Sequence, residues 1–561
     1  MRSPLSFSLA TFVLLIAAQS PTLAQTAHVP ADYPTIQAAL TAGATTVYVS
    51  QGVYAETPVI NHDVTLLPEP PADVREPIPF PVVTGLSIVQ PSSTPNVYIR
   101  GFRFLAPVKQ TNSLTEGGIT IIEGCRMDGG FQATGQGLQE VVKIRGCVVT
   151  GDLFVDAYYT DVSGNMVWKG ALTVHSNGAG AIIRDNIVMG PAPIGIASTS
   201  GDASGEVTRN LVTGATVGYS INSASVTGNV AIDCGGAGYQ LDPTHASGSF
   251  SADTALRCAG SGISAVTSTG YFDIHDNYIS SAGTYGIHVG PSLFPTTLAN
   301  NVVKSSGSHG IWVENGEAAS GNHVLLAGGI GIATNGTADH NVVGRSSLHG
   351  IAATGVSQNT SYLNGASGYD IIGSGTHAIS NNIGYGNIAY GLLYAASGSA
   401  TLACNDWFGN STGATSGVAA GATDLAVNPL FCNLPADVVT LSNASPVLAA
   451  PGCGLIGALG AGCTSPTSVA PAPGEELGLR VSPNPSRGGV DLLFSASRQV
   501  GEVEIFDVQG ARRFHANVAS GDQTIRWSGL DARGAPVPAG VYFARRVDGS
   551  HTQTVRFVLE R

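Results

Sequence analysis

Charge is scarce in this sequence. Asp, Glu, Lys and Arg together make up 11% of the 561 residues, whereas a typical soluble chain carries about 25%. Lysine and methionine occur only four times each. A helical bundle needs Ala, Leu, Glu and Lys in quantity, so this composition argues against one.

The few charges are unevenly distributed. Residues 25–476 hold 13 basic and 30 acidic side chains, whereas residues 477–561 hold 11 arginines, no lysine and 8 acidic side chains. The acidic part should repel polyanions at long range. We therefore expect no nucleic-acid partner.

Beyond its N-terminus the sequence lacks an apolar run that approaches the ~20 residues of a membrane span. Residues 1–24 are typical of a signal peptide, with Arg2 as the positive start, an apolar stretch at 7–18, and Thr22 and Ala24 at the cleavage positions. The sequence predicts an exported chain without a transmembrane span in its mature form. We expect it to be secreted or to lie at the outer cell surface.

Metal-binding patterns are missing as well. No CxxC or Cys/His spacing suggests zinc, and the glycine-rich calcium nonapeptide does not occur. The closest local group is Asp273, His275 and Asp276. On a strand, Asp273 and His275 would share one face and Asp276 would take the other, so at most two of them could reach one ion. We expect no metal site and no cofactor.

The sequence does contain an internal repeat with a regular period. Glycine is abundant, at 73 residues, and an Asn or an equivalent residue recurs with a mean spacing of about 21.5 residues. A Gly followed by an apolar residue recurs in step with it, as in Gly286-Ile287 and Gly310-Ile311. The Asn slots are Cys125, Cys147, Asn165, Asn186, Asn210, Asn229, Asp253, Asn277, Asn301, Asn322, Asn341, Asn359, Asn382 and Asn405.

The residues before each slot alternate. An apolar residue lies three positions before the slot, as at Ile122, Val207 and Leu298, and the next residue is mostly polar. This alternation indicates a strand with one buried face. The period fits three short strands and three turns in each coil. Stacked coils would pair like strands in parallel, and the Asn side chains at the bend would bond the backbone and one another.

With these features the chain resembles the right-handed parallel β-helix, the pectin-lyase-like fold, over roughly residues 28–463. The segments at 28–40 and 46–56 are similar to the start of such proteins, where a short amphipathic helix caps the first coil. A series of ordinary β-sandwiches is the alternative, and a propeller is disfavoured because its blades repeat every ~40–50 residues.

The expected fold class is therefore all-β, a right-handed parallel β-helix followed by a small C-terminal β-sandwich. The expected boundaries are a signal peptide at 1–24, a β-helix at 25–463 with an N-terminal cap (28–60) and a Cys-containing C-terminal cap (404–463), a linker at 464–476 and a β-sandwich at 477–561.

Eight cysteines suit an oxidising compartment. Two pairs would occupy matching positions on adjacent coils, where disulfides and stacked thiols are equally open, and the pairing of the other four is left open. The stacked pairs are Cys125/Cys147 and Cys234/Cys258, whereas Cys453 and Cys463 close a Gly-rich loop and Cys404 and Cys432 flank the stretch before it.

The tail alternates short strands with Gly, Asp and Pro turns, which indicates one small β-sandwich. It resembles the C-terminal sorting domain of the type IX secretion system and the immunoglobulin-like domain of flagellar hook-capping proteins. This resemblance implies a secretion and surface-attachment signal with the secretion machinery as partner; a plain spacer is the alternative. The matching residues are Pro483-Asn484-Pro485, Asp507 with Gly510, Trp527-Ser528-Gly529, Asp531 with Gly534, and Ala539–Phe543.

Catalytic motifs of the fold are incomplete. The His-Gly elements at Ser308–Gly310 and Leu348–Gly350 resemble part of the polygalacturonase motif, but the adjoining Asp-Asp pair is absent, and both lie on the repeat's own Gly slot. A lyase would need a basic residue as its base. A cluster on one strand face could bind an anionic sugar, although a ladder of surface ion pairs is the simpler interpretation; it contains Glu123, Lys143, Arg145, Asp161 and Arg184.

One constellation remains as the candidate substrate-binding site. Aromatic faces on a flat β surface stack sugar rings, and a nearby carboxylate can bind hydroxyls. We predict a carbohydrate-interacting, non-catalytic protein. The alternatives are a polysaccharide lyase or glycoside hydrolase, and a structural stalk in which these residues form an aromatic ladder or lie beneath a loop. The site residues are Tyr285, His288, His309, Trp312 and Glu314 on two adjacent coils, with Asp242 two coils back.

Overall fold

The chain divides into two compact units, residues 1–466 and 467–561. In this computed structural model the described residues are 25–70, 80–89, 95–111, 117–134, 140–200, 205–222, 225–241, 248–266, 272–291, 296–464, 479–482, 486, 488–493, 501–507, 510–519, 524–531, 533–548 and 551–559. The predicted signal peptide at 1–24 and residues 465–476 of the predicted linker lie outside them. No helix among the described residues is long and apolar enough to cross a membrane.

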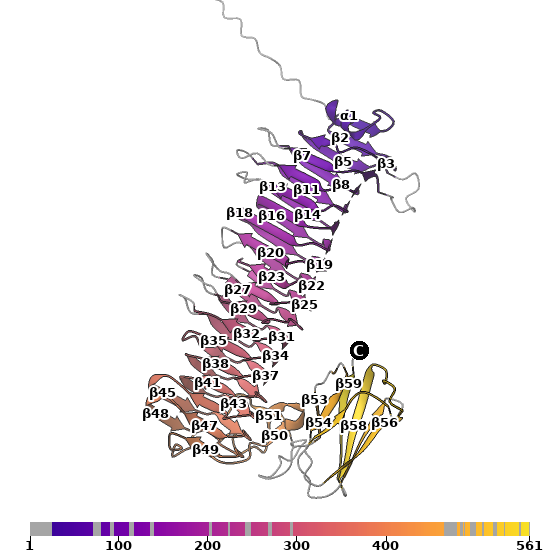
Figure 1. The fold of residues 1–561 in the computed structure, drawn as a ribbon. Coiled ribbons are helices and arrows are strands. Elements are labelled where there is room, and N and C mark those ends of the chain that lie inside the picture. Colours follow the sequence, from indigo (N-terminus) through magenta and orange to yellow (C-terminus); the bar gives the residue numbers. More distant parts are fainter. Residues whose placement is uncertain are drawn as a thin grey trace, which may run out of the picture. The chain divides into compact units, whose positions relative to one another are not determined.

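The first unit is a parallel β-helix of about 18 turns, and its fold class is the one that the period predicts. Figure 1 shows its coils stacked on one another. A typical coil contributes one strand to each of three parallel stacks, which we call stacks A, B and C. The long strands β16 and β18 run through the corner between stacks C and A and belong to both.

Stack A precedes the Asn slot of each coil. Its strands are β1 (Thr26–Val29), β2 (Thr46–Val49), β5 (Val64–Pro68), β8 (Val97–Arg100), β11 (Ile119–Glu123), β14 (Val141–Arg145), β16 (Leu153–Ser163), β18 (Leu172–Arg184), β21 (Glu206–Thr208), β24 (Ser225–Thr227), β27 (Gly248–Ser251), β30 (Phe272–His275), β33 (Thr297–Ala299), β36 (Ala319–Ser320), β39 (Thr337–Asp339), β42 (Gly355–Ser357), β45 (Ser374–Ser380) and β48 (Ser397–Ala403).

Stack B follows the Asn slot. Its strands are β3 (Val53–Tyr54), β6 (Val82–Val83), β9 (Arg103–Phe104), β12 (Arg126–Met127), β15 (Val148–Thr150), β17 (Met166–Trp168), β19 (Ile187–Met189), β22 (Leu211–Thr213), β25 (Val230–Ile232), β28 (Thr254–Leu256), β31 (Tyr278–Ala282), β34 (Val302–Ser306), β37 (His323–Ala327), β40 (Val342–Gly344), β43 (Thr360–Tyr362) and β46 (Ile383–Tyr385).

Stack C carries the Gly-Ile series. Besides the first halves of β16 and β18, its strands are β4 (Val59–Ile60), β7 (Leu86–Val89), β10 (Val108–Thr111), β13 (Phe131–Thr134), β20 (Ile194–Ser200), β23 (Val217–Ile221), β26 (Tyr239–Leu241), β29 (Ile263–Ala265), β32 (Ile287–Val289), β35 (Ile311–Val313), β38 (Ile332–Thr334), β41 (Ile351–Ala353), β44 (Tyr369–Ile371), β47 (Tyr390–Tyr394) and β49 (Gly413–Ser416).

The core is one apolar column inside the coils. The residues three positions before the Asn slots, such as Ile122, Val207 and Leu298, are fully buried, as the alternation predicts. Each pairs in register with its equivalent on the next coil, so that Ile274 faces Leu298 and Leu298 faces Ala319. Burying one apolar side chain from each strand is the main stabilisation that the stack can supply.

The Asn slots form a continuous buried ladder. The side-chain oxygen of Asn322 accepts hydrogen bonds from the backbone N–H and from Nδ2 of Asn301, both at 3.0 Å. Nδ2 of Asn301 also donates to the carbonyl of Ile274 at 2.8 Å. The bend therefore satisfies polar groups that burial would otherwise leave unpaired. At Asp253, which has no side-chain N–H group, only the backbone N–H donates to the next Asn. The ladder consists of Asn165, Asn186, Asn210, Asn229, Asp253, Asn277, Asn301, Asn322, Asn341, Asn359, Asn382 and Asn405 and ends on Asp424.

The residue before each ladder position has a left-handed backbone. The φ angles of Arg209 and Asp276 are 53° and 57°, a region that few residue types favour. This geometry corrects one expectation, that Asp276 would point away from His275. Because the strand ends there, the Asp276 carboxylate turns back and lies 2.8 Å from Nδ1 of His275.

The described cysteines separate into two kinds. The stacked pairs Cys125/Cys147 and Cys234/Cys258 are buried thiols. In the C-terminal cap, disulfides join Cys404 to Cys453 and Cys432 to Cys463. The two cysteines that flank the Gly-rich loop at 453–463 are thus not bonded to each other but to earlier parts of the cap.

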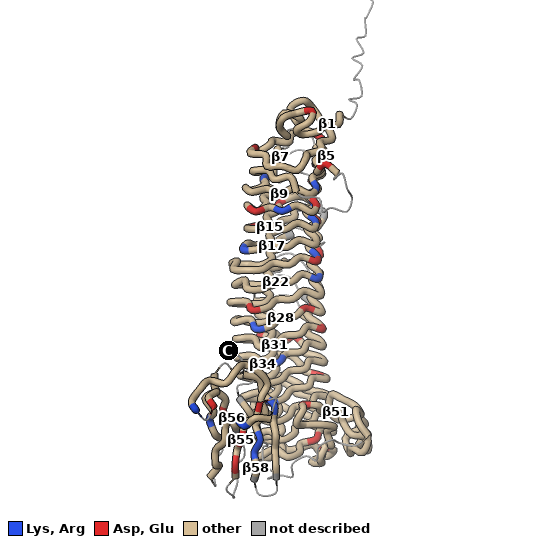
Figure 2. The backbone as a smooth tube through the Cα atoms, turned by 90° about the vertical axis from the view of Figure 1, so that its right-hand side faces the viewer, with Lys and Arg blue, Asp and Glu red and all other residues tan. Residues whose placement is uncertain are grey.

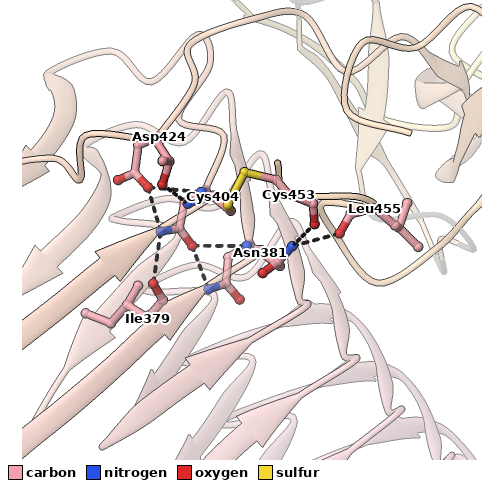
Figure 3. Close-up of a disulfide and its surroundings, with 9 residues drawn as sticks. Ile379, Asn381, Cys404, Asp424, Cys453 and Leu455 are labelled. Atoms are coloured by element: carbon pink, nitrogen blue, oxygen red, sulfur yellow. Dashed lines mark hydrogen bonds between the residues drawn. A yellow bond between two sulfur atoms is a disulfide. The ribbon is translucent and has the colours of Figure 1, made fainter. Parts of the chain in front are cut away.

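Both ends of the stack are covered by the chain itself. The predicted helix is present as α1 (Ile36–Thr41), with Thr35 as its N-cap, and Glu56 accepts hydrogen bonds from its first N–H groups. At the other end, the cap contains β50 (Phe431–Asn433), the 3-10 helix η1 (Leu434–Ala436), β51 (Val438–Ser442) and β52 (Ala461–Cys463). Figure 3 shows how the Cys404–Cys453 disulfide fastens the cap beside Asn381, whose Nδ2 donates to the carbonyls of Cys453 and Leu455.

Charges are sparse along the coils (Figure 2). The cluster on stack A forms ion pairs, with Arg145 bonded to Asp161 and 3.7 Å from Glu123. These contacts agree with the interpretation of that cluster as a ladder of surface ion pairs. Similar pairs join Arg209 to Asp185 and Arg257 to Asp233.

The second unit has two antiparallel sheets over one small core. Two of its predicted motifs are turns: Gly510 and Gly534 have φ angles of 80° and 76°, and their N–H groups donate to the carbonyls of Asp507 and Asp531. Trp527 lies in the core. The strands are β53 (Arg480–Ser482), β54 (Val490–Leu493) and β57 (Thr524–Trp527) in one sheet, and β55 (Gly501–Asp507), β56 (Arg512–Val518), β58 (Gly540–Asp548) and β59 (His551–Leu559) in the other.

Candidate functional site

The five predicted site residues that the structure describes lie on the outward side of stack C, within its strands or at their ends. The middle residue of each short strand points outward, and the parallel register places His288 of β32 beside Trp312 of β35. Tyr285 and His309 each precede the Gly of their coil, and the N–H of Gly286 donates to the carbonyl of His309. Figure 1 shows these strands along one flank of the helix. The two columns thus have the arrangement that the sequence register predicts.

Four of these side chains form a compact group, which we call the aromatic cluster: Tyr285, His288, His309 and Trp312. The rings of His288 and Trp312 stack with centroids 4.5 Å apart and an interplanar angle of 2°. Tyr285 lies against both, at 4.8 and 5.0 Å, and His309 meets Trp312 edge-on at 5.8 Å. Aromatic pairs in these geometries hold one another in place.

Glu314 anchors the group at the strand end. Its Oε1 lies 2.8 Å from Nε2 of His288. The His288 side chain is 12% exposed and that of Glu314 is 30% exposed, so the carboxylate reaches solvent while the imidazole is largely covered. The backbone of Glu314 is fixed on both sides, because its N–H donates to the carbonyl of Val289 and its carbonyl accepts from Nδ2 of Asn335.

His309 is held as a neutral imidazole in one orientation. Its Nδ1 accepts a hydrogen bond from the N–H of Ile330 at 2.9 Å, so the ring proton lies on Nε2. Burial, together with the nearby His288, lowers the pKa of His309. The ring therefore presents a fixed N–H donor at the edge of Trp312.

Steric constraints explain why glycine occupies the positions beneath the aromatic cluster. A Cβ on Gly286 would lie 2.3 Å from a methyl of Val303, and one on Gly310 would lie 2.3 Å from a methyl of Val324. Stack C can approach the core this closely only because these positions lack a side chain. The repeated Gly therefore fixes the positions of the outward-facing residues that precede and follow it in each coil.

Two further acidic residues complete the account of the predicted site. Asp242 lies outside the described residues, so its relation to the cluster stays a prediction. Glu317 occupies the same turn as Glu314, and its side chain is buried. Burial raises the pKa of Glu317.

Two residues on the same columns were not among the predicted site residues. His349 continues the column of Tyr285 and His309, and Asp370 continues the column of His288 and Trp312 through Ala333 and Ala352. The register could have found both, since Asp370 follows its Gly by two positions, as His288 and Trp312 do. His349 lies in the His-Gly element at Leu348–Gly350, which the repeat itself explains, and Asp370 belongs to no catalytic motif.

This face carries groups that can bind a ligand by ring stacking and hydrogen bonding. Within the described ranges, no three His, Cys, Asp or Glu side chains stand close enough to hold a metal ion. The face instead offers a stacked aromatic surface, imidazole N–H donors and an accessible carboxylate. Such a combination suits a ring with an apolar face and hydroxyl groups.

Comparison with known proteins agrees with the fold. Residues 170–326 match the model of the family described as "Right handed beta helix region". No curated protein matches this chain.

Among solved structures, the chain is similar to PorZ, a surface component of the type-IX secretion system of Porphyromonas gingivalis, at 25% identity over 18% of this chain and 13% of PorZ, with a TM-score of 0.14. The catalytic domain of a GH87 alpha-1,3-glucanase matches at 11% identity over 73% of this chain and 69% of that domain, with a TM-score of 0.21. The A-module of the mannuronan C-5 epimerase AlgE6 of Azotobacter vinelandii matches at 16% identity over 70% of this chain and 93% of the module, with a TM-score of 0.19. At TM-scores this low, the likenesses carry no argument about activity.

Proposed function

We propose that this protein is an exported β-helix that binds glycans through the aromatic cluster without cleaving them. The observation that carries the proposal is the flat stack of His288 on Trp312, flanked by Tyr285 and anchored by Glu314. A sugar ring can pack its C–H face on the side of Trp312 turned away from His288, toward Ala333 of the next coil, and the carboxylate of Glu314 accepts hydrogen bonds from its hydroxyls.

A glycan array tests the proposal directly. The full chain should bind one or a few oligosaccharides on the array, and Trp312→Ala should reduce that binding at least tenfold, because it removes the largest ring of the surface. Trp168→Ala is the matched control. Trp168 is 42% exposed on stack B, and its loss should leave binding unchanged.

Binding that survives in Trp312→Ala would contradict the proposal. Absence of binding to every glycan, in a folded protein, would instead favour the structural stalk. Thermal melts of both variants separate a lost contact from a lost fold.

A glycoside hydrolase is the second candidate function. It is favoured by Glu314 and Glu317, two carboxyl groups in one turn, of which the first pairs with His288 and the second has a pKa raised by burial. Hydrolases use two carboxyl groups whose environments separate their pKa values. Release of reducing ends that disappears in both Glu314→Gln and Glu317→Gln would establish this function over simple binding.

A lyase is separated by a different product. Formation of unsaturated uronates that is lost in Lys143→Ala would support it, since elimination needs a basic residue at the sugar.

We further propose that residues 477–561 are a secretion and surface-attachment domain and that the protein acts outside the cell. The support is the set of residues by which the tail resembles sorting domains, and the two cap disulfides, which suit an oxidising compartment. Cleavage within 464–476 during export would support the sorting role. An intact tail on a freely released product would count against it.

A further inference from the structure

His349 and Asp370 lie on the same outward face as the aromatic cluster, and their hydrogen-bonding groups are incompletely used. We propose that this pair is a second contact point for the ligand of the cluster, and that the ligand is a linear oligosaccharide of three or more sugars without carboxylate or sulfate groups. This inference rests on the proposed function, which it deepens.

The first support is the tautomer of His349. Its Nδ1 accepts a hydrogen bond from the N–H of Ser367 at 3.3 Å. A neutral imidazole has one acceptor and one donor nitrogen, so the proton lies on Nε2. His309 is fixed in the same way by Ile330, and both imidazoles therefore present an Nε2–H group from the same column.

The second support is the gap between the pair. Nε2 of His349 and Oδ2 of Asp370 are 3.9 Å apart, which is too far for a hydrogen bond. A hydroxyl oxygen between them could bond both groups, because the gap is shorter than two hydrogen bonds laid end to end. The side chains are 22% and 16% exposed, so a ligand can reach them.

The carboxyl group of Asp370 is incompletely hydrogen-bonded within the described part of the chain. Its Oδ1 is buried and has no hydrogen-bond partner among the described residues. Burial also raises the pKa of this carboxyl group. Because Oδ1 is enclosed and the side chain is 16% exposed, Oδ2, the oxygen that faces His349, is the atom that a ligand hydroxyl can reach.

The spacing of the two contact points sets the minimum ligand length. Trp312 and Asp370 are three coils apart on one column, about 14 Å at the ~4.8 Å spacing of strands. Only Ala333 and Ala352 stand between them on that column. Both side chains are small, and Ala352 is only 4% exposed, so a ligand would pass over these two positions. We call the outward column from Trp312 to Asp370 the strip, and a single sugar ring cannot reach both of its ends.

The charge of the strip sets the ligand class. The outward positions of stack C from Gln240 to Leu393 contain no Lys or Arg, whereas Glu314 and Asp370 contribute carboxyl groups. Arginine is the usual partner of sugar carboxylates and sulfates. An anionic glycan would meet repulsion here and no compensating cation.

The test measures dissociation constants for oligosaccharides of two to six sugars. The probes are neutral gluco-, manno- and xylo-oligosaccharides, chitosan oligomers and oligogalacturonates, each tested with the wild-type chain, Trp312→Ala, Asp370→Ala and His349→Ala. Asp276→Asn is the matched control, because Asp276 is an exposed carboxylate at the bend that follows stack A. Asp370→Asn replaces Asp370→Ala if the latter fails to fold.

We expect Trp312→Ala to abolish binding at every length. Asp370→Ala and His349→Ala should weaken binding at least tenfold for three sugars or more and less than twofold for a disaccharide. The inference is overturned if both variants bind long oligosaccharides like the wild type while Trp312→Ala does not, which leaves the proposed function standing. Tight binding of oligogalacturonates by the wild type would also overturn it, and wild-type protein that binds none of the probes would overturn both proposals.

Discussion

The bend after stack A and the outward face of stack C belong to the same coils but are built by opposite rules. From Asn165 to Asn405, every coil but one places an Asn at the bend, and its amide is satisfied by its neighbours and the backbone, as at Asn301. On the outward face of stack C consecutive coils place Ser264, His288, Trp312 and Ala333. The repeated Asn at the bend stabilises the stack. The residues that differ from coil to coil on the outward face of stack C create a surface that can select a ligand.

This contrast predicts which substitutions affect stability and which affect ligand binding. Changes at the bend should alter stability and leave binding alone except through the fold. Changes on the face should do the reverse.

The largest loss of stability is expected for Asn322→Ala. The change removes the oxygen that accepts two hydrogen bonds from Asn301 and leaves those donors buried. At about 1–3 kcal/mol for each orphaned group, together with a small cavity, the protein should lose about 3–6 kcal/mol. Thermal and urea unfolding measure this loss. Asn335→Ala, which removes an exposed amide with one hydrogen bond, is the control, and equal melting temperatures for the two variants would refute the role of the ladder.

Asp253 is the exception within the ladder and gives it a pH dependence. Burial raises the pKa of Asp253 to about 7 from 3.8, and its Oδ2 has no hydrogen-bond partner in the described part of the chain. The folded state therefore holds a proton that the unfolded chain releases. The stabilisation is present below the unfolded pKa and is lost as pH rises through the folded pKa, about 4 kcal/mol in all at 1.36 kcal/mol for each pKa unit.

Asp253→Asn should remove this loss, because its amide can donate as at the other slots. The difference in melting temperature between the variant and the wild type should grow from pH 4 to pH 8. The pKa of Asp406 is also raised to about 7 by burial. Asp406 is present in both proteins, so its contribution to the pH dependence cancels in the difference. A difference that does not change with pH would rule out the assigned titration.

Gly310→Ala connects the two regions. The new Cβ would lie 2.3 Å from Val324 and 2.6 Å from the carbonyl of Gly331, and such overpacking costs about 1–3 kcal/mol. The outward neighbours His309 and Trp312 should shift with the strand, so we expect weaker glycan binding as well. In Gly316→Ala the Cβ has only one atom within 4 Å, at 3.8 Å, and neither property should change. A Gly310→Ala protein with wild-type stability would show that the close approach is not required.

Trp312→Ala should have the smallest effect on stability, about 1 kcal/mol, because the side chain packs on the surface. Its effect on binding should nevertheless be the largest. Unfolding curves and array binding measured on one preparation test both statements. A stability loss as large as that of Asn322→Ala would mean that the aromatic cluster is a structural ladder.

Repetition explains which features could be predicted from sequence. The Asn slots, the buried alternation and the columns of Tyr285/His309 and His288/Trp312 all follow from one register, since a parallel stack places equivalent residues above one another. The expected helix is present as well, at Ile36–Thr41, within the segment that resembles the start of such proteins.

Features without a period could not be predicted in this way. The C-terminal cap folds back on the stack through irregular loops, so spacing alone did not reveal that Cys404 bonds Cys453 and Cys432 bonds Cys463. A second ladder through Asn364 and Asn387 was missed because it covers only the last coils.

The position of Asp276 depended on a left-handed backbone at the strand end, which an alternating pattern does not encode. His349 and Asp370 were not assigned to the site because no complete motif contains them and the equivalent residues on most coils are small or uncharged. Only the register, applied coil by coil, identifies them.

The most direct test of the account is a crystal structure of the protein with an oligosaccharide selected on the array. We predict density for a sugar ring stacked on Trp312 beside His288, with a hydroxyl within hydrogen-bonding distance of Glu314. A sugar bound elsewhere on the molecule, with Trp312 and His288 untouched, would contradict the assignment of this face as the binding site.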